Sequence, residues 1–429
     1  MKNSLKKLII FILTVEAGYL LKRKNPKIIA VTGSVGKTST KDAIYTILKN
    51  HYPTRKNEKS FNSEIGVPLT VLGLPNAWNS TWGWFKNIVD GFFIAAFSKE
   101  YPEYLIVEAG IDRPGDMTNL TKWLKPDIVV LTRLPDVPVH VEYFATPEAV
   151  TAEKMKLVEA LKPEGVLVFN ADDKIIQAQL ETVRSKRVGF SRYLVSDFTA
   201  REDKVFYRDD EPVGTAFVLA SAEQKQEFKI GGVLGPQQVY IYAAAATVAA
   251  ECGVDLSKSA LALSTHTPPP GRMRIFKGIK GTFIIDDTYN SSPAATEQAL
   301  AALREIKYRK RKIAVLGDML ELGKFSQAEH ERIGELVPKV ADVLVTIGVR
   351  ARKIAEAALA AGLSEQSILQ YEDSLKAGKE LQNFIQSGDL ILVKASQSIR
   401  AEKTVEEIML EPERAVEFLV RQDRAWEKR

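Results

Sequence analysis

A glycine-rich segment near the start of the sequence places a lysine and several hydroxyl groups beside flexible backbone. It reads "TGSVGKTS" and lies between the apolar run "KIIAV" and the helix-like run "KTSTKDAIYTILKNH". Gly33 and Gly36 allow backbone amides to turn toward an oxyanion, Lys37 can reach terminal phosphates, and the Thr38 hydroxyl can bind Mg²⁺. Phosphate loops usually carry a further glycine where Val31 stands here, so this is a short variant that binds nucleotide phosphates.

Candidate metal ligands follow two of the later apolar runs. Glu108 ends "YLIVE", and a carboxylate at the carboxyl end of a central parallel strand points into the crevice where such sheets bind ligands. Beside a loop that binds phosphate with Mg²⁺, this carboxylate is a candidate metal ligand. His140 follows "DIVVLT", and Lys154 lies on a predicted helix. Taken alone, the histidine could be a packing or surface residue and the lysine a solvated helix charge.

The elements that must position these side chains alternate between strands and helices. Apolar runs recur at "YLIVEAG", "DIVVLT", "GVLVFNAD", "GTFIIDDTYN", "KIAVLGDM", "DVLVTIG" and "LILVKAS". Such a pattern predicts parallel sheets covered by helices on both faces. The stiff segment "THTPPPGRM" divides the chain into residues 26–265 and 271–429. We therefore expect an α/β protein, with a P-loop-type parallel-sheet ATP-binding domain followed by a Rossmann-like α/β C-terminal domain.

Composition restricts the possible classes of protein. With 429 residues, 45% hydrophobic and 26% charged, the chain is long enough for two or three ordinary globular domains. Its single cysteine excludes an intramolecular disulfide. A net charge of +5, spread along the chain, favours small anionic substrates and argues against a dedicated nucleic-acid surface.

The sequence of residues 1–25 predicts a separate apolar helix. The run "LIIFILTVEAGYLL" is flanked by Lys6, Lys7 and "KRK" and contains Glu16. It is shorter than the roughly 20 apolar residues of a membrane span, and no cleavage site for a signal peptide follows. The helix could pack on the first domain or lie on a membrane surface. The aromatic stretch "WNSTWGWFKNIVDGFFIAAF" could likewise pack with this helix as core or form a surface that contacts the membrane interface.

Several further motifs resemble those of the Mur ligase family and occur in that family's order. They are "FNSEIGVPLT", "VEAG", the segment from His140 to Lys154, "FNADD", "PPGRM", "DDTYN", "GDMLELG" and "LVKASQSIRAEKTVEEI". The resemblance covers about residues 26–412. It implies an ATP-dependent ligase of cell-wall peptide assembly that forms an amide bond through an acyl phosphate. D-alanyl-D-alanine is the favoured group to be added to a muramoyl-peptide acceptor. A non-UDP or lipid-linked acceptor, or a non-catalytic nucleotide-binding partner subunit, remain alternatives.

The resemblance also assigns roles to individual residues. Lys37, Lys154 and Arg272 would be catalytic. Lys154 would be carboxylated by CO₂, because an ammonium beside two divalent cations is repelled whereas a carbamate is an anionic ligand. Nucleotide contacts would come from Gly33, Ser34, Val35, Gly36, Lys37, Thr38, Ser39, Arg272, Asp287, Tyr289 and Asn290. Magnesium ligands would be Thr38, Glu108, His140 and Lys154. The substrates would meet Asn62, Lys394, Ser396 and Arg400.

The sequence departs from the family pattern in three places. Only residues 1–25 precede the first strand, so we expect the family's UDP-binding domain to be missing. Gln237, Gln238 and Ile241 stand where the family has His-Asn and a further Asn, and Ala395 and Gln397 replace a glycine and a basic residue. We expect a monomer in the cytoplasm, where ATP is, that uses small-molecule substrates. Membrane association through the N-terminal helix stays open.

Overall fold

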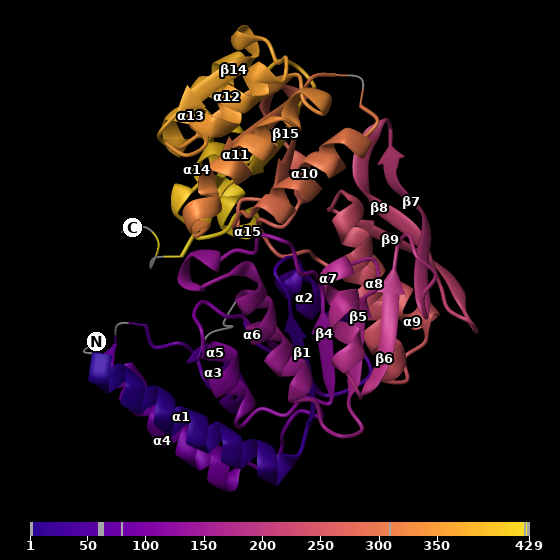
Figure 1. Cartoon of the computed structure of the whole chain (residues 1–429), viewed down its shortest axis with the longest axis vertical. Coiled ribbons are helices and arrows are strands. Elements are labelled where there is room, and N and C mark those ends of the chain that lie inside the picture. The colour runs from indigo at the N-terminus through magenta and orange to yellow at the C-terminus, as the bar shows by residue number, and fades with distance from the viewer. Residues whose placement is uncertain (1–2, 59–63, 79, 309, 424–425, 427–429) are drawn as a thin grey trace.

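Two α/β units are stacked along the long axis of the molecule (Figure 1). The computed structural model describes residues 3–58, 64–78, 80–308, 310–423 and 426. The first unit contains a nine-stranded sheet and the second a six-stranded sheet. The predicted α/β class, with mainly parallel sheets, is confirmed.

In the first sheet β1, the strand before the phosphate loop, lies between β3 and β4. Its order is β2-β3-β1-β4-β5-β6-β7-β8-β9. The strands are β1 (Lys27–Thr32), β2 (Thr54–Lys56), β3 (Tyr104–Glu108), β4 (Ile128–Leu131), β5 (Val166–Asn170), β6 (Lys186–Ser191), β7 (Phe198–Arg208), β8 (Glu211–Ala220) and β9 (Lys225–Gly231). The pairs from β2 to β7 are parallel, whereas β7, β8 and β9 form an antiparallel extension. The carboxyl ends of β1, β3 and β4 therefore meet at one edge, where such sheets bind ligands.

Helices cover both faces of this sheet because its strands are apolar on both sides. Ile29 and Val31 pack under α2, α8 and α9, whereas Ile28 and Ala30 pack under α1 and α3 to α7. The bounds are α1 (Asn3–Lys24), α2 (Lys37–Leu48), α3 (Gly66–Leu72), α4 (Thr81–Phe97), α5 (Asp116–Thr121), α6 (Pro147–Glu159), α7 (Lys174–Gln179), α8 (Pro236–Glu251) and α9 (Leu256–Ser264). A parallel sheet buried in this way explains why its strands read as continuous apolar runs.

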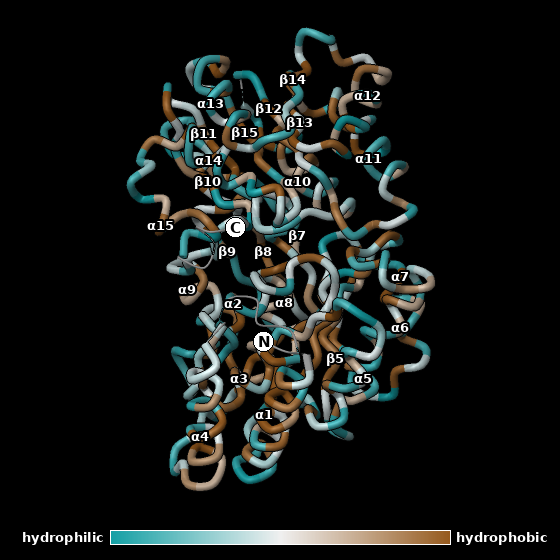
Figure 2. The backbone as a smooth tube through the Cα atoms, turned by 90° about the vertical axis from the view of Figure 1, so that its left-hand side faces the viewer, coloured by the Kyte–Doolittle hydropathy of each residue, from teal (hydrophilic) through white to brown (hydrophobic). Residues whose placement is uncertain are grey.

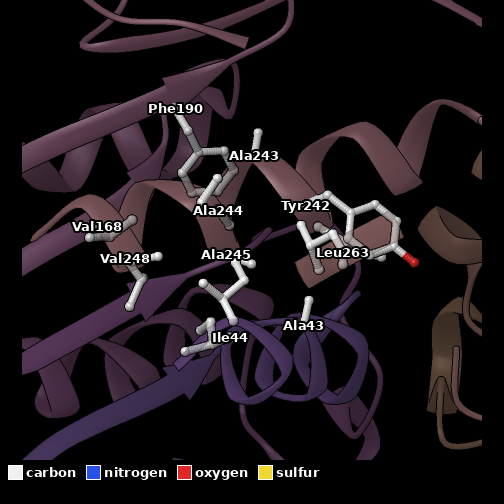
Figure 3. Packing of buried hydrophobic residues seen from close by; sticks show 14 of the residues in the cluster. Ala43, Ile44, Val168, Phe190, Tyr242, Ala243, Ala244, Ala245, Val248 and Leu263 are labelled. Carbon is white, nitrogen blue, oxygen red and sulfur yellow. The ribbon is translucent and has the colours of Figure 1, made fainter. Parts of the chain in front are cut away.

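The alanine-rich helix α8 fixes α2 in place. Figure 3 shows Ala243, Ala244 and Ala245 of α8 between the sheet residues Val168 and Phe190 and the α2 residues Ala43 and Ile44. All of these side chains are buried. Small side chains let the two helices approach closely, so α2 and the loop at its N-terminus are held rigidly against the sheet.

The second sheet repeats the layered arrangement. Its order is β10-β11-β15-β12-β13-β14, with β10 antiparallel and the rest parallel. The strands are β10 (Arg274–Lys277), β11 (Phe283–Asp286), β12 (Lys312–Gly317), β13 (Val343–Ile347), β14 (Ile368–Tyr371) and β15 (Leu390–Lys394). On one face lie α10 (Pro293–Glu305), α11 (Ser326–Gly334) and α12 (Arg352–Ala360). On the other lie α13 (Ser374–Phe384), α14 (Glu402–Ile408) and α15 (Ala415–Phe418).

The N-terminal helix α1 lies beside α4 at the end of the molecule remote from the second sheet (Figures 1 and 2). The Arg23 guanidinium donates hydrogen bonds to the carbonyl oxygens of Ala95, Ala96 and Ser98 and so joins the C-terminal ends of the two helices. Within the described residues, no helix is both long and apolar enough to span a bilayer.

Candidate active site

A cavity of about 640 Å³ lies between the two units, at the carboxyl ends of β1 and β3. Both units contribute to its lining. Thirteen of the residues predicted from the sequence line it: Ser34, Val35, Gly36, Lys37, Ser39, Glu108, His140, Arg272, Asp287, Tyr289, Asn290, Lys394 and Ser396. Residues more than 350 positions apart in the chain therefore meet in one site, which requires that the two units face each other.

The phosphate loop has the backbone geometry that its glycines predict. Gly33 has φ 138° and Gly36 has φ 84°. A Cβ on Gly33 would collide with the Thr132 hydroxyl, so this position requires glycine. The backbone N–H of Ser34 donates to the carbonyl of Arg133 at 2.8 Å, and the Thr132 hydroxyl donates to the carbonyl of Val35 at 2.7 Å. The two residues that follow β4 thus fix the loop before the N-terminus of α2, where an anion is favoured.

Two lysines lie close together around this loop. Burial lowers the pKa of Lys37, opposed by the nearby Glu108 carboxylate. Burial, together with the charge of Lys37, lowers the pKa of Lys154 well below its usual range. Lys154 is 3% exposed, and its Nζ lies 2.7 Å from the Ser34 hydroxyl. A buried lysine beside a second cation favours its neutral amine form, and the neutral amine is the form that reacts with CO₂.

Arg272 extends from the second unit to the phosphate loop. Its guanidinium donates to the Thr38 hydroxyl at 3.3 Å and stacks 4.0 Å above the Tyr289 ring. The Nε of Arg272 is buried and makes no hydrogen bond within the described residues. A buried guanidinium N–H without a partner is costly, and a phosphate oxygen would satisfy it. Together with Lys37 and Lys154, this residue places three basic side chains around one loop.

Two oxygen donors suited to Mg²⁺ lie at the ends of the elements that flank the phosphate loop. Glu108, 1% exposed, ends β3 and is in register with Val31 of β1, while Thr38 is the second residue of α2. No group of three His, Cys, Asp or Glu side chains in the described part of the chain is placed to hold a metal. The Glu108 carboxylate and the Thr38 hydroxyl are the kind of oxygen ligands that Mg²⁺ takes, one or two from the protein together with substrate phosphates.

His140 is held between acidic side chains from both units. Its Nδ1 lies 2.6 Å from Glu321 Oε2 of the second unit, and its Nε2 lies 3.6 Å from Asp112 Oδ1. The close His140 imidazole lowers the pKa of Glu321. His140 lies in the left-handed backbone region, with φ 70°. The structure therefore places this imidazole at the cavity and joins it to the opposite unit.

The second unit contributes a buried ion pair at the ends of its strands. Lys394 ends β15 and its Nζ lies 2.6 Å from Asp287 Oδ2, just after β11. The same ammonium donates to the Asn290 carbonyl at 2.9 Å. The Ser396 hydroxyl accepts a hydrogen bond from the Leu320 backbone N–H at 2.9 Å. These contacts fix the side of the cavity that faces the phosphate loop.

A few predicted residues do not line the cavity. Gly33 lies in the phosphate loop, Thr38 lies in the first turn of α2, and Lys154 reaches the loop from α6 through its contact with the Ser34 hydroxyl. Arg400 pairs with the buried Glu402 and stacks over the ring of Trp426, which lines the cavity. Asn62 lies outside the described residues. The roles of all these side chains stay predictions.

The cavity also contains residues that the sequence analysis passed over. Asp112 and Arg113 lie in "AGIDRPGDM", Glu321 lies in "GDMLELG", and Gln298 lies on α10. The first three belong to segments that resemble family motifs or adjoin one, so the motifs could have indicated them. Gln298 gave no sequence signal, because a single amide on a helix is indistinguishable from a surface residue.

Ile241 illustrates the departure at the start of α8. It lies against Gly36, where an added Cβ would be 3.4 Å from its Cγ1. The neighbouring Gln237 and Gln238 are buried and line the cavity. The helix therefore still presents amides to the site, but an apolar side chain packs against the loop where the family has an asparagine.

Comparisons with known proteins agree with this geometry. A model of the Mur ligase middle domain matches residues 31–82 and 86–249, and a model described as Mur ligase, glutamate ligase domain, matches residues 271–397. The UDP-N-acetylmuramoyl-tripeptide–D-alanyl-D-alanine ligase of Bacillus subtilis is 29% identical over 399 residues, which cover 91% of this chain and 78% of that enzyme.

Two further relatives extend the comparison. The enzyme of the same name from Mycobacterium bovis is 31% identical, covering 86% of this chain and 70% of its own length. The crystal structure of a MurF ligase from Thermotoga maritima in complex with ADP superposes with a TM-score of 0.75 at 25% identity, covering 93% of this chain and 83% of that one. The resemblance predicted from the motifs is confirmed, and this chain belongs to the Mur ligase family.

Proposed function

We propose that this protein is an ATP-dependent ligase that adds D-alanyl-D-alanine to a muramoyl-peptide acceptor in cell-wall assembly. The observation that carries the proposal is that Arg272, from the second unit, reaches the Thr38 hydroxyl beside Lys37 at a cavity lined by both units. Relatives that bear this activity in their names match most of the chain.

The reaction needs a cluster of positive charge where the terminal phosphate of ATP is transferred. A carboxylate oxygen of the acceptor attacks the γ-phosphorus and releases ADP, which forms an acyl phosphate. The amine of the second substrate then attacks the acyl carbon and displaces inorganic phosphate, which leaves an amide. Lys37 and Arg272 would hold the transferring phosphoryl group and offset its negative charge, and the loop amides would orient it.

The metal ions of the family would be held by this chain's own oxygens. Thr38 and Glu108 would take one Mg²⁺, and Glu108, His140 and carboxylated Lys154 a second. Bound Mg²⁺ supplies Lewis-acid neutralisation of the phosphates. The carbamate on Lys154 would form from its buried amine in the neutral form. His140 could bind a metal through Nε2 while its Nδ1 stays beside Glu321 Oε2.

The second unit would complete the site by closing over the nucleotide. Tyr289, Asn290 and the Lys394–Asp287 pair lie on its side of the cavity and would contact the nucleotide or the incoming amine. Closure keeps water away from an acyl phosphate, which would otherwise hydrolyse. We take residues 26–265 and 271–429 as the two bodies that move, and we propose that the enzyme acts as a monomer in the cytoplasm.

Phosphate release provides the test. Wild-type protein should release phosphate from ATP only when both the muramoyl-tripeptide and D-alanyl-D-alanine are present, and mass spectrometry should detect the amide product. Lys37→Ala should abolish this release, whereas Lys49→Ala, at the exposed end of the same helix, should leave it unchanged. Acceptors with and without the UDP group should be compared. If no acceptor supports phosphate release, or if both lysine variants retain full turnover, the proposal fails.

A further inference from the structure

We propose that the outer face of α1 and α4 docks this protein on the surface of an anionic lipid bilayer. The inference does not rest on the ligase reaction, because it concerns a surface outside the cavity. Figures 1 and 2 place both helices at one end of the molecule, away from the second unit. Contact at this end would leave the two units free to move relative to one another.

Helix α1 is apolar around most of its circumference. Leu13 and Leu20 are fully buried and join the core beneath the helix. On the opposite side, Phe11 is 65% exposed, and Val15 and Tyr19 are each 55% exposed. A helix that is hydrophobic all round is normally covered on all sides. The inner face of α1 is therefore core, and its outer face lacks a cover within the described chain.

Helix α4 continues this surface with aromatic side chains. Trp82 is 73% exposed and stacks on Phe85, while Phe92, Phe93 and Phe97 contact one another edge-on or tilted. Twelve of the 23 large apolar side chains exposed in the described residues lie on α1, on α4 or at Trp78, just before α4. Such a concentration marks an interaction surface, and aromatic rings are the residues enriched where a protein meets the edge of a bilayer.

The charges around this surface identify the occupant. In α1 and α4 together, six Lys or Arg residues accompany only two acidic residues, Glu16 and Asp90. Exposed lysines stand at both ends of α1, at Lys6, Lys7 and Lys22. A second copy docking symmetrically would bring this basic surface against itself, with few carboxylates to pair. Anionic phospholipid headgroups match both the positive flanks and the apolar centre.

The mode of binding follows from the helix lengths and their packing. Neither helix can cross a bilayer. Their inner faces are already packed on the first unit, so only the outer side chains can enter the lipid. The pair therefore lies in the plane of the membrane, with its aromatic rings at the level of the headgroups.

Vesicle co-sedimentation of the full chain tests this inference. Wild-type protein should pellet at low salt with vesicles of equal parts phosphatidylglycerol and phosphatidylcholine, and much less with phosphatidylcholine alone. The combined variant Phe11→Ser, Trp82→Ser and Phe93→Ser should lose at least tenfold in partitioning. A matched control, Leu261→Ser, Val349→Ser and Val416→Ser, alters equally exposed apolar residues elsewhere and should bind as wild type.

The electrostatic part has its own variant. Replacing Lys6, Lys7 and Lys22 by glutamine should weaken partitioning roughly a hundredfold, at about fivefold for each lysine near an anionic surface. Thermal unfolding of every variant checks that the fold persists. Because all the replaced side chains are exposed, the midpoints should stay close to that of the wild type.

Three outcomes would overturn the inference. In the first, wild-type protein stays in the supernatant with anionic vesicles at low salt. In the second, the α1/α4 variant and its control bind equally well. In the third, light scattering without lipid shows a dimer that only the α1/α4 variant converts to monomer, because then a second copy covers this face.

Discussion

Glu16 offers a quantitative test of how α1 packs on α4. This carboxyl lies on α1 next to Gly91 of α4, and its Oε2 is a buried atom without a hydrogen-bond partner in the described residues. Burial raises its pKa from an ordinary value of 4.5 to about 7. Such a shift corresponds to about 3 kcal/mol. Since the side chain is only half-buried, we halve this to about 1.5 kcal/mol for solvent screening.

The sign follows from proton binding. Between pH 4.5 and 7 the folded chain holds more protons on Glu16 than the unfolded chain, so stability falls as pH rises through this window. Glu16→Gln removes the charge. It should match wild type near pH 4.5 and exceed its free energy of unfolding by about 1.5 kcal/mol at pH 8.

Urea unfolding at pH 4.5, 6 and 8 measures the difference. Val15→Gln, which places the same amide on the neighbouring exposed position, should show no gain that grows with pH. A difference between Glu16→Gln and wild type that is constant across these pH values would refute the reasoning, because it would mean that burial does not affect the ionisation of this carboxyl.

Three further substitutions test the cavity. Gly33→Ala should weaken ATP binding at least tenfold, because the added Cβ would collide with Thr132. The control is Gly115→Ala, since Gly115 also has a positive φ but no atom within 4 Å of an added Cβ. Calorimetry measures the ATP affinity of both variants. Lys154→Ala should lose roughly a hundredfold in kcat, equivalent to about 3 kcal/mol. Millimolar formate or acetate should restore part of the lost activity. Full activity of the Lys154→Ala variant in the absence of these carboxylates would argue against a carbamate. Lys394→Met should cost about 3 kcal/mol of stability by leaving Asp287 as an unpaired buried charge. Adding Asp287→Asn should restore stability but not turnover. Urea unfolding measures the stability of both variants, and phosphate release measures their turnover.

Much of the fold could be predicted because its signals are local. A strand buried on both faces reads as a continuous apolar run, so "KIIAV" and "LILVK" indicated β1 and β15 directly. The edge strands β2 and β14 gave no such signal. Thr54–Lys56 is too short, and "ILQY" contains a glutamine that an edge tolerates. Strands β7 and β9 gave no continuous apolar run either, because antiparallel strands with exposed positions mix polar and apolar residues.

The site was predicted less completely, because spacing along the chain does not report which units meet. Family motifs indicated Lys37 and Arg272 separately, but not that the Arg272 guanidinium would reach the Thr38 hydroxyl. The contact between His140 and Glu321 joins two units and has no pattern in either segment. For the N-terminal helix, the sequence allowed packing on the first domain or contact with a membrane surface. The structure shows that the inner face packs on the first unit and that the outer face is exposed.

The central claim is that a carboxylate of the acceptor is activated by phosphorylation at this cavity. An acceptor labelled with ¹⁸O in its reacting carboxylate tests it most directly. The account predicts that one labelled oxygen passes to each inorganic phosphate released, because the bond between the acyl carbon and the phosphate-bound oxygen breaks when the amine attacks. Phosphate formed together with the amide product but free of label would contradict the account.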